Sequence, residues 1–220
     1  NPTGRVLDRS ELELLAAACV EHDLIAITDE VYEHLVYDGV HVPLATLPGM
    51  RERTLTVSSL GKTFGLTGWK IGWASGPAEL VDAVAAIKQF LTFSGGTPLQ
   101  HAAAFALNRP DDEIRAAGEV LRGKRDRLAA GLTAAGFGVL PTAGTYFLNV
   151  DTAGIPGAGS ATELCLRLPH EAGVVAIPLS AFRADPDGAA RSLVRFAFPK
   201  RDEVLDEGVA RLADWAARQG

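Results

Sequence analysis

"VSSLGKTFGLTGWKIGW", residues 57–73, places one lysine, Lys62, between a serine-glycine turn and a second turn rich in glycine and tryptophan. A lysine that only solvates a surface needs no such setting. Three interpretations are open: a phosphate-binding loop, a lysine that forms a Schiff base with a cofactor, or an ordinary strand-to-helix turn that carries a charge. The residues elsewhere in the chain decide between them.

The composition of the whole chain limits the classes of protein to consider. The 220 residues are 47% hydrophobic and carry a net charge of −6 with no long basic run, which argues against a nucleic-acid or anionic-membrane surface. Cys19 and Cys165 lie far apart in apolar helical patterns, as expected of buried thiols in a reducing compartment. No apolar run has the length of a membrane span and no signal-peptide pattern opens the chain, so we expect a cytoplasmic protein.

The first half of the chain alternates strand-like and helix-like segments. Ser10 and Glu13 have capping-box spacing and predict a helix over residues 10–22. "DLIAITD" (23–29) is typical of a buried parallel strand. Further strands are predicted at 53–60 and 70–76, and helices at 77–92 and 97–108. This alternation predicts an α/β layered sheet.

After Pro110 the pattern changes. A long helix is predicted over residues 111–135, followed by strands and helices in mixed order. The strands are expected at 144–151, 173–178 and 192–199, and the helices at 162–172 and 201–219. We therefore expect a second, smaller α+β domain.

The phosphate-loop interpretation fails at a required residue. The motif G-x-x-x-x-G-K-[ST] needs a first glycine that lets the backbone wrap a phosphate. Gly61, Lys62 and Thr63 supply the end of the motif, but Thr56 occupies the position of the first glycine.

The Schiff-base interpretation finds a candidate for every role. Pyridoxal 5'-phosphate chemistry needs an amine for the aldehyde, an acid for the pyridine nitrogen, a donor to the phenolic oxygen and a phosphate anchor. Lys62 supplies the amine, and Asp29 ends an apolar strand, where open parallel sheets place their ligands. Tyr32 can present a phenol, while Ser59 and Lys70 flank Lys62 as phosphate ligands.

Four blocks in this order resemble the fold-type I, class I/II aminotransferases that use pyridoxal phosphate: "NPTG", "ITDEVYEHLVYD", "SSLGKTFGLTGWKIGW" and "LVRFAF". The resemblance runs from Asn1 to about Lys200. Within that family, residues 29–64 are most similar to the kynurenine, glutamine and methionine aminotransferases and to actinobacterial N-succinyldiaminopimelate aminotransferases.

The resemblance implies a domain organisation. Residues 1–110 are expected to be the C-terminal part of the large cofactor-binding domain, which has a mostly parallel sheet. Residues 111–220 are expected to be the small C-terminal domain, reached through the helix at 111–135.

The resemblance also implies roles for single residues around the cofactor ring. Lys62 matches the lysine that holds pyridoxal phosphate as an aldimine, and Asp29 matches the partner of the pyridinium nitrogen. Asn1 and Tyr32 match the two donors to the phenolic oxygen. Each alone has a plainer interpretation: a turn opener for Asn1, a helix cap for Asp29 and a solvated amine for Lys62.

The remaining predicted residues bind the charged groups of cofactor and substrate. Ser59 and Lys70 match the family's phosphate ligands, and Arg195 matches the arginine that binds the substrate α-carboxylate. Arg195 has independent support, because a guanidinium within the apolar strand "SLVRFAFP" must be paired and its planar fork fits a carboxylate. An internal salt bridge to a glutamate is the alternative.

The activity implied is transfer of an amino group from an amino acid to a 2-oxo acid. A fold-type I carbon-sulfur β-lyase is the alternative enzyme, since the same lysine, aspartate and arginine serve elimination. A regulator with a disused aminotransferase domain is the alternative outside enzymes. The five histidines show no ligand spacing, so no metal site is predicted.

The opening of the chain suggests that more sequence belongs to the protein. "NPTG" begins in a turn without a methionine, and the predicted strands would leave an edge and a face of the sheet uncovered. We therefore expect a substantial segment before Asn1 and a homodimer with its sites at the interface.

Overall fold

The computed structural model describes residues 1–185 and 188–219, which form two compact units. The N-terminal unit comprises residues 6–118, and the C-terminal unit comprises residues 1–5 and 119–220. The boundary lies within the long helix α5 (Asp111–Ala134), which confirms the helix predicted at 111–135.

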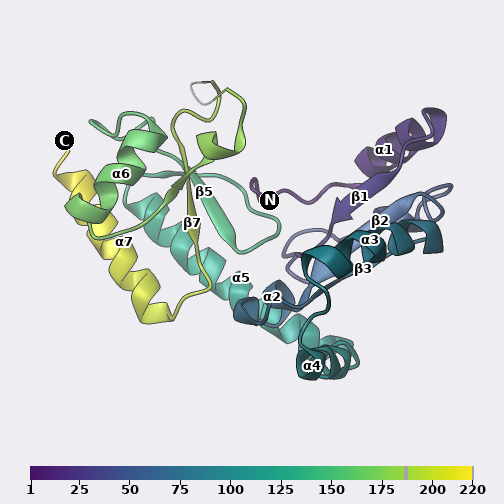
Figure 1. The fold of residues 1–220 in the computed structure, drawn as a ribbon. Helices are drawn as coiled ribbons and strands as arrows, with labels where there is room; N and C mark the ends of the chain where they lie inside the picture. The colour runs from purple at the N-terminus through teal and green to yellow at the C-terminus, as the bar shows by residue number, and fades with distance from the viewer. Residues whose placement is uncertain (186–187, 220) are drawn as a thin grey trace. The chain divides into compact units, whose positions relative to one another are not determined.

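The N-terminal unit is built on a three-stranded sheet of order β1-β2-β3 (Figure 1). Its strands and helices in chain order are α1 (Arg9–Glu21), β1 (Ala26–Asp29), η1 (Leu44–Thr46), β2 (Thr54–Ser59), α2 (Leu60–Thr63), η2 (Thr67–Trp69), β3 (Gly72–Ser75), α3 (Ala78–Leu91) and α4 (Thr97–Leu107). Strand β1 pairs parallel with β2, whereas β3 pairs antiparallel with β2. The predicted α/β class is confirmed, and the short α2 was not predicted.

Two details of the N-terminal unit differ from expectation. Asp8, not Ser10, caps α1: its carboxylate accepts from the Glu11 backbone N–H, and the Glu11 carboxylate accepts from the Asp8 backbone N–H. Aspartate with glutamate three residues later satisfies the same two backbone donors as the predicted pair. Strand β1 pairs in parallel as predicted, but it is not buried: Ile27 is 72% exposed.

Two small apolar clusters hold the elements of this unit together. In the first, Leu12 and Ala16 of α1 lie in one cluster with Leu44, Leu47 and Met50. In the second, Leu60 of α2, Ile71 just before β3 and Ala103 of α4 lie together. The second cluster fixes the short helix that carries Lys62.

The C-terminal unit contains a four-stranded sheet of order β4-β5-β7-β6, in which every pair is antiparallel. Its elements after α5 are β4 (Gly138–Val139), β5 (Phe147–Asp151), α6 (Ala161–Glu171), β6 (Ile177–Pro178), η3 (Leu179–Phe182), β7 (Leu193–Ala197) and α7 (Asp202–Ala217). The predicted helices and the strands expected at 144–151 and 192–199 are present, whereas the strand expected at 173–178 is reduced to the two residues of β6. The two-residue strand β4 is an addition. These elements confirm the predicted α+β character.

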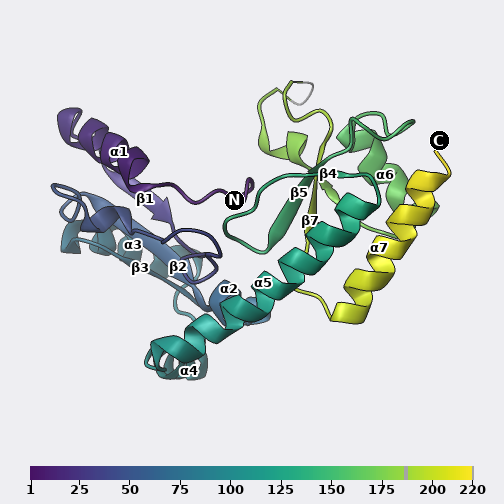
Figure 2. The same cartoon turned by 180° about the vertical axis from the view of Figure 1, so that it is seen from behind.

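Helices α5 and α7 lie side by side in the C-terminal unit (Figures 1 and 2). A Cβ at Gly131 would lie 2.6 Å from a methyl carbon of Val209, so only glycine permits this close approach. The Arg127 guanidinium binds both carboxylate oxygens of Asp206 across the same helix pair. A small residue and an ion pair together set the spacing of the two helices.

Candidate active site

A cavity of about 730 Å³ in the N-terminal unit is the candidate active site. Residues of β2, β3, α2 and α3 line it, together with the last residue of β1. Four predicted site residues are among the lining: Asp29, Ser59, Lys62 and Lys70. The structure thus brings an acid, a hydroxyl and two amines to one cavity large enough for a cofactor.

Asp29 reaches the cavity because it is the last residue of strand β1. Successive side chains of a strand point to opposite faces, and the Asp29 side chain is exposed whereas Glu30 is buried. The Val31 backbone N–H lies 3.4 Å from Asp29 Oδ1. This acid therefore faces a solvent-accessible space at the carboxyl end of a parallel strand.

Lys62 lies on α2, which starts directly after β2. The side chain is half-buried and lines the cavity, and its Nζ lies 5.9 Å from the centroid of the Tyr32 ring. This distance is at the outer limit of a cation–π contact. Tyr32 is therefore close to the lysine, as predicted, although it is not one of the residues that line the cavity.

Ser59 and Lys70 stand on either side of Lys62 along the chain and meet at the same cavity. Ser59 is the residue before α2, so its hydroxyl lies at the start of that helix. Lys70 has φ 54° and ψ 38°, a left-handed conformation that costs energy for a residue other than glycine. Such strained residues cluster at ligand sites, and this one carries an ammonium group to the cavity.

Gly72 allows strands β2 and β3 to approach closely beside the cavity. A Cβ at this position would lie only 2.8 Å from the Ser58 carbonyl oxygen. The pairing of Gly72 with Ser59 fixes the end of β2 from which α2 starts. A larger residue at position 72 would displace the segment that carries Ser59 and Lys62.

The other two predicted residues, Asn1 and Arg195, meet within the C-terminal unit. Arg195 lies on β7 and is only 7% exposed, and its Nη1 donates to Asn1 Oδ1 at 2.8 Å. Its guanidinium carbon lies 3.9 Å from the centroid of the Phe147 ring and 4.5 Å from that of Phe182. Two aromatic faces and an amide oxygen therefore hold the guanidinium in one orientation.

Asn149, which sequence analysis missed, ties the first residues of the chain to this unit. It is 1% exposed, stands opposite Arg195 in the β5–β7 ladder, and donates from Nδ2 to the Pro2 carbonyl at 2.9 Å. The backbone N–H groups of Ala143 and Gly144 donate to the Gly4 carbonyl at 2.8 and 3.0 Å. An asparagine within the apolar stretch "YFLNVD" was the available signal.

Comparison with known proteins identifies the family to which this fold and these residues belong. The family described as aminotransferase class I and II matches residues 1–212, and the chain belongs to it. Class I and II aminotransferases depend on pyridoxal phosphate. The sequence-based identification of the family is confirmed.

Individual relatives sharpen this assignment. The chain is 52% identical to the N-succinyldiaminopimelate aminotransferase structure from Mycobacterium tuberculosis, with a TM-score of 0.94 over 98% of this chain and 56% of that one. A methionine aminotransferase structure from Escherichia coli gives 37% identity and a TM-score of 0.90 over 97% and 56%. Kynurenine–oxoglutarate transaminase 3 of Mus musculus is 38% identical over 100% of this chain and 52% of its own length. The chain thus spans about half the length of the relatives it matches.

The donor set of the cavity fits pyridoxal phosphate. The cofactor offers an aldehyde, a basic ring nitrogen and a phosphate, which require an amine, an acid and cationic or hydroxyl donors respectively. The cavity lining supplies Lys62, Asp29 and the pair Lys70 and Ser59 for these three groups.

Proposed function

We propose that the protein is an aminotransferase of the EC 2.6.1 type, which moves an amino group from an amino acid to a 2-oxo acid with pyridoxal phosphate. The single observation that carries this proposal is the shared cavity of Asp29, Ser59, Lys62 and Lys70 in a chain of this family. The bound cofactor supplies an electron sink for the bonds at the substrate's α-carbon.

Lys62 and Asp29 would perform the proton chemistry in this proposal. The Lys62 amine holds the cofactor between turnovers, and its Nζ moves the proton from the substrate α-carbon during turnover. The Asp29 carboxylate binds the ring N–H and keeps that nitrogen charged. The exposed position of Asp29 at the cavity and the half-buried position of Lys62 support these roles.

The other predicted residues would orient the reactants. Ser59 Oγ and Lys70 Nζ bind the phosphate, and Tyr32 and Asn1 donate to the phenolic oxygen. The Arg195 fork binds the substrate α-carboxylate. The bond from Arg195 Nη1 to Asn1 Oδ1 supports the roles of Asn1 and Arg195. Because the amide oxygen of Asn1 accepts from Arg195, the amide nitrogen of Asn1 is the group that can donate to the phenolic oxygen.

The wider organisation is also proposed. We assign residues 1–110 to the large cofactor-binding domain and residues 111–220 to the small domain. The two compact units support a two-part organisation, although they divide after Gly118 and group residues 1–5 with the C-terminal half. The protein would act as a cytoplasmic homodimer. Analytical ultracentrifugation can measure the mass of the assembly. Among the described residues, no helix combines the length and the apolar character needed to cross a bilayer.

The amino donor is the open part of the proposal, and the names of the relatives supply candidates. Similar proteins are named for N-succinyldiaminopimelate, methionine and kynurenine. The 52% identity to the first makes N-succinyldiaminopimelate the leading donor to test. A panel of the three donors with 2-oxoglutarate ranks them by kcat/KM.

The test of the proposed function is Lys62→Ala, with Lys88→Ala as the matched control because Lys88 also lines the cavity. We expect Lys62→Ala to lower transamination by roughly 10²- to 10⁴-fold or more, the range for losing a proton-transfer group, with weakened but measurable cofactor binding. Lys88→Ala should keep most activity.

Two outcomes contradict the proposal. Substantial transamination by Lys62→Ala without added amine would remove the central role of this lysine. Release of pyruvate and ammonia by the wild-type protein, without amino transfer to an oxo acid, would make it a β-lyase instead.

A further inference from the structure

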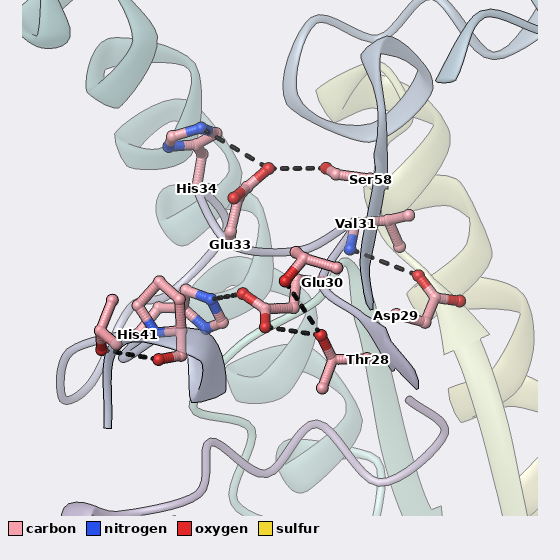
Figure 3. Close-up of polar contacts among 11 residues, drawn as sticks. Thr28, Asp29, Glu30, Val31, Glu33, His34, His41 and Ser58 are labelled. Atoms are coloured by element: carbon pink, nitrogen blue, oxygen red, sulfur yellow. Dashed lines mark hydrogen bonds and ion pairs between the residues drawn. The ribbon is translucent and has the colours of Figure 1, made fainter. Parts of the chain in front are cut away.

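Behind the cavity, on the opposite face of β1 from Asp29, lies a buried acid with no role so far. Glu30 is 8% exposed, and its backbone N–H extends the parallel ladder by donating to the Val57 carbonyl at 2.8 Å. Figure 3 shows the Asp29 and Glu30 side chains directed to opposite sides of the strand end. The position of one side chain therefore constrains the other.

The Glu30 carboxylate is fully engaged by its neighbours. His41 Nε2 lies 2.7 Å from Glu30 Oε2, Thr28 Oγ1 donates to Oε1 at 2.8 Å, and the Leu44 backbone also bonds to it. Burial raises the pKa of Glu30, but hydrogen bonds from His41 and Thr28 outweigh burial and hold the pKa below its ordinary value. The ionised carboxylate only accepts, so His41 Nε2 donates.

The turn that follows β1 is held at its other end by a second glutamate. Ser58, which is 2% exposed on β2, donates from Oγ to Glu33 Oε1 at 2.6 Å. The Glu33 backbone N–H donates to the Glu30 carbonyl at 2.9 Å and closes the turn. Tyr32 lies in the chain between Glu30 and Glu33, so both anchored glutamates constrain its backbone. Figure 3 shows the two glutamates and their partners.

A buried carboxylate is an expensive way to pack the back of a sheet. Removing its charge from water costs several kcal/mol before its partners compensate, and an apolar side chain would fill such a space at no such cost. What the charged group adds is direction, because three donors fix the carboxylate where an apolar contact would allow it to shift. The element that receives this direction is the end of β1.

We propose that Glu30 is a positioning residue, which His41 holds from behind so that Asp29 and Tyr32 keep their places beside Lys62. This inference rests on the proposed function, since that function gives Asp29 and Tyr32 their roles. Glu30 is not one of the residues that line the cavity, and its carboxylate is assigned no contact with the reactants.

The test is a double-mutant cycle between Glu30→Gln and Asp29→Asn in the complete protein. The readout is the dissociation constant for pyridoxal phosphate, measured by absorbance titration, with the thermal midpoint as the check that each variant is folded. We expect Glu30→Gln alone to weaken binding by roughly five- to twentyfold, but by less than about threefold when Asp29→Asn is already present. A residue that acts through Asp29 loses its effect once that carboxylate is gone.

His41 provides a second route to the same answer, should Glu30→Gln fail to fold. His41→Ala should weaken cofactor binding as Glu30→Gln does, whereas His41→Gln, which keeps a donor, should restore part of the loss. Glu13→Gln is the matched control, because Glu13 pairs with Arg9 at 2.9 Å on the exposed face of α1. It should leave the dissociation constant unchanged.

Three results would overturn the inference, and they are distinguishable. An Asp29→Asn variant with unchanged cofactor affinity and kcat would overturn the proposed function and this inference with it. If Asp29→Asn has a strong effect, but Glu30→Gln raises the dissociation constant by the same factor with and without Asp29→Asn, the inference alone is overturned. Ligand atoms of Glu30, Glu33 and His41 lie within 4.8 Å of one another. If Zn²⁺ raises the thermal midpoint of the wild-type protein but not that of Glu30→Gln, these residues form a cation site instead.

Discussion

The two units of the chain bury their apolar residues to different extents. In the C-terminal unit, Trp215 and Phe198 are 0% exposed, and the strand residues Leu148 and Val194 are at most 1% exposed. In the N-terminal unit, helix α3, all of whose residues the structure describes, has no buried residue, and Phe90 is 84% exposed.

The two units also differ in what holds their proposed site residues in place. In the C-terminal unit, the rings of Phe147 and Phe182 hold the Arg195 guanidinium in place. In the N-terminal unit, Asp29 and Lys62 lie on short elements. Three local features fix these elements: the close strand approach at Gly72, the left-handed backbone of Lys70 and the anchored turn after β1. Local geometry, together with the small apolar cluster of Leu60, Ile71 and Ala103, therefore positions the cavity residues.

The largest expected effect tests the packing side of the comparison. Trp215→Ala should lower the free energy of unfolding by about 3–5 kcal/mol, because it empties a fully buried site and removes the bond from Nε1 to Glu171 at 2.8 Å. Phe90→Ala in the same chain should change it by no more than about 0.5 kcal/mol. Denaturant titration measures both, and equal losses would show that Phe90 is covered in solution.

The second prediction separates the chemical roles of the two units. Arg195→Ala should lower kcat/KM for carboxylated donors, by a factor that corresponds to a loss of roughly 2–5 kcal/mol in transition-state stabilisation. The loss should be much smaller for amines that lack the carboxylate. Asp29→Asn should lower kcat strongly for both kinds of donor with little change in fold, since the ring nitrogen is common to every turnover.

Steady-state kinetics with matched amino acids and amines check this contrast. If Arg195→Ala affects both kinds of donor equally, the arginine is structural. An unchanged kcat in Asp29→Asn would leave Asp29 as the end of a strand and nothing more.

Local patterns in the sequence predicted most helices and strands, because apolar spacing and capping act over a few residues. The cap of α1 was misplaced by two residues because "DRSELE" contains two overlapping capping signals, Asp8 with Glu11 and Ser10 with Glu13. Exposure of Ile27 was not predictable, since an apolar run does not state what covers it.

The site was partly predictable for a related reason. Asp29, Ser59, Lys62 and Lys70 lie close to strand ends in the sequence, so motif spacing and strand order suffice to bring them together. The bond between Asn1 and Arg195 joins residues 194 positions apart, and only the fold shows it. His41 and Glu30 likewise meet through a loop whose path no local pattern specifies.

Reductive trapping can identify the lysine that holds the cofactor, which we propose to be Lys62. Sodium borohydride traps pyridoxal phosphate on the amine that binds it, and peptide mapping by mass spectrometry then finds the modified residue. Three lysines line the cavity, Lys62, Lys70 and Lys88, so the outcome is not fixed in advance. We expect the phosphopyridoxyl mass on Lys62 alone; the same mass on Lys70 or Lys88 with Lys62 unmodified would show that another lysine holds the cofactor.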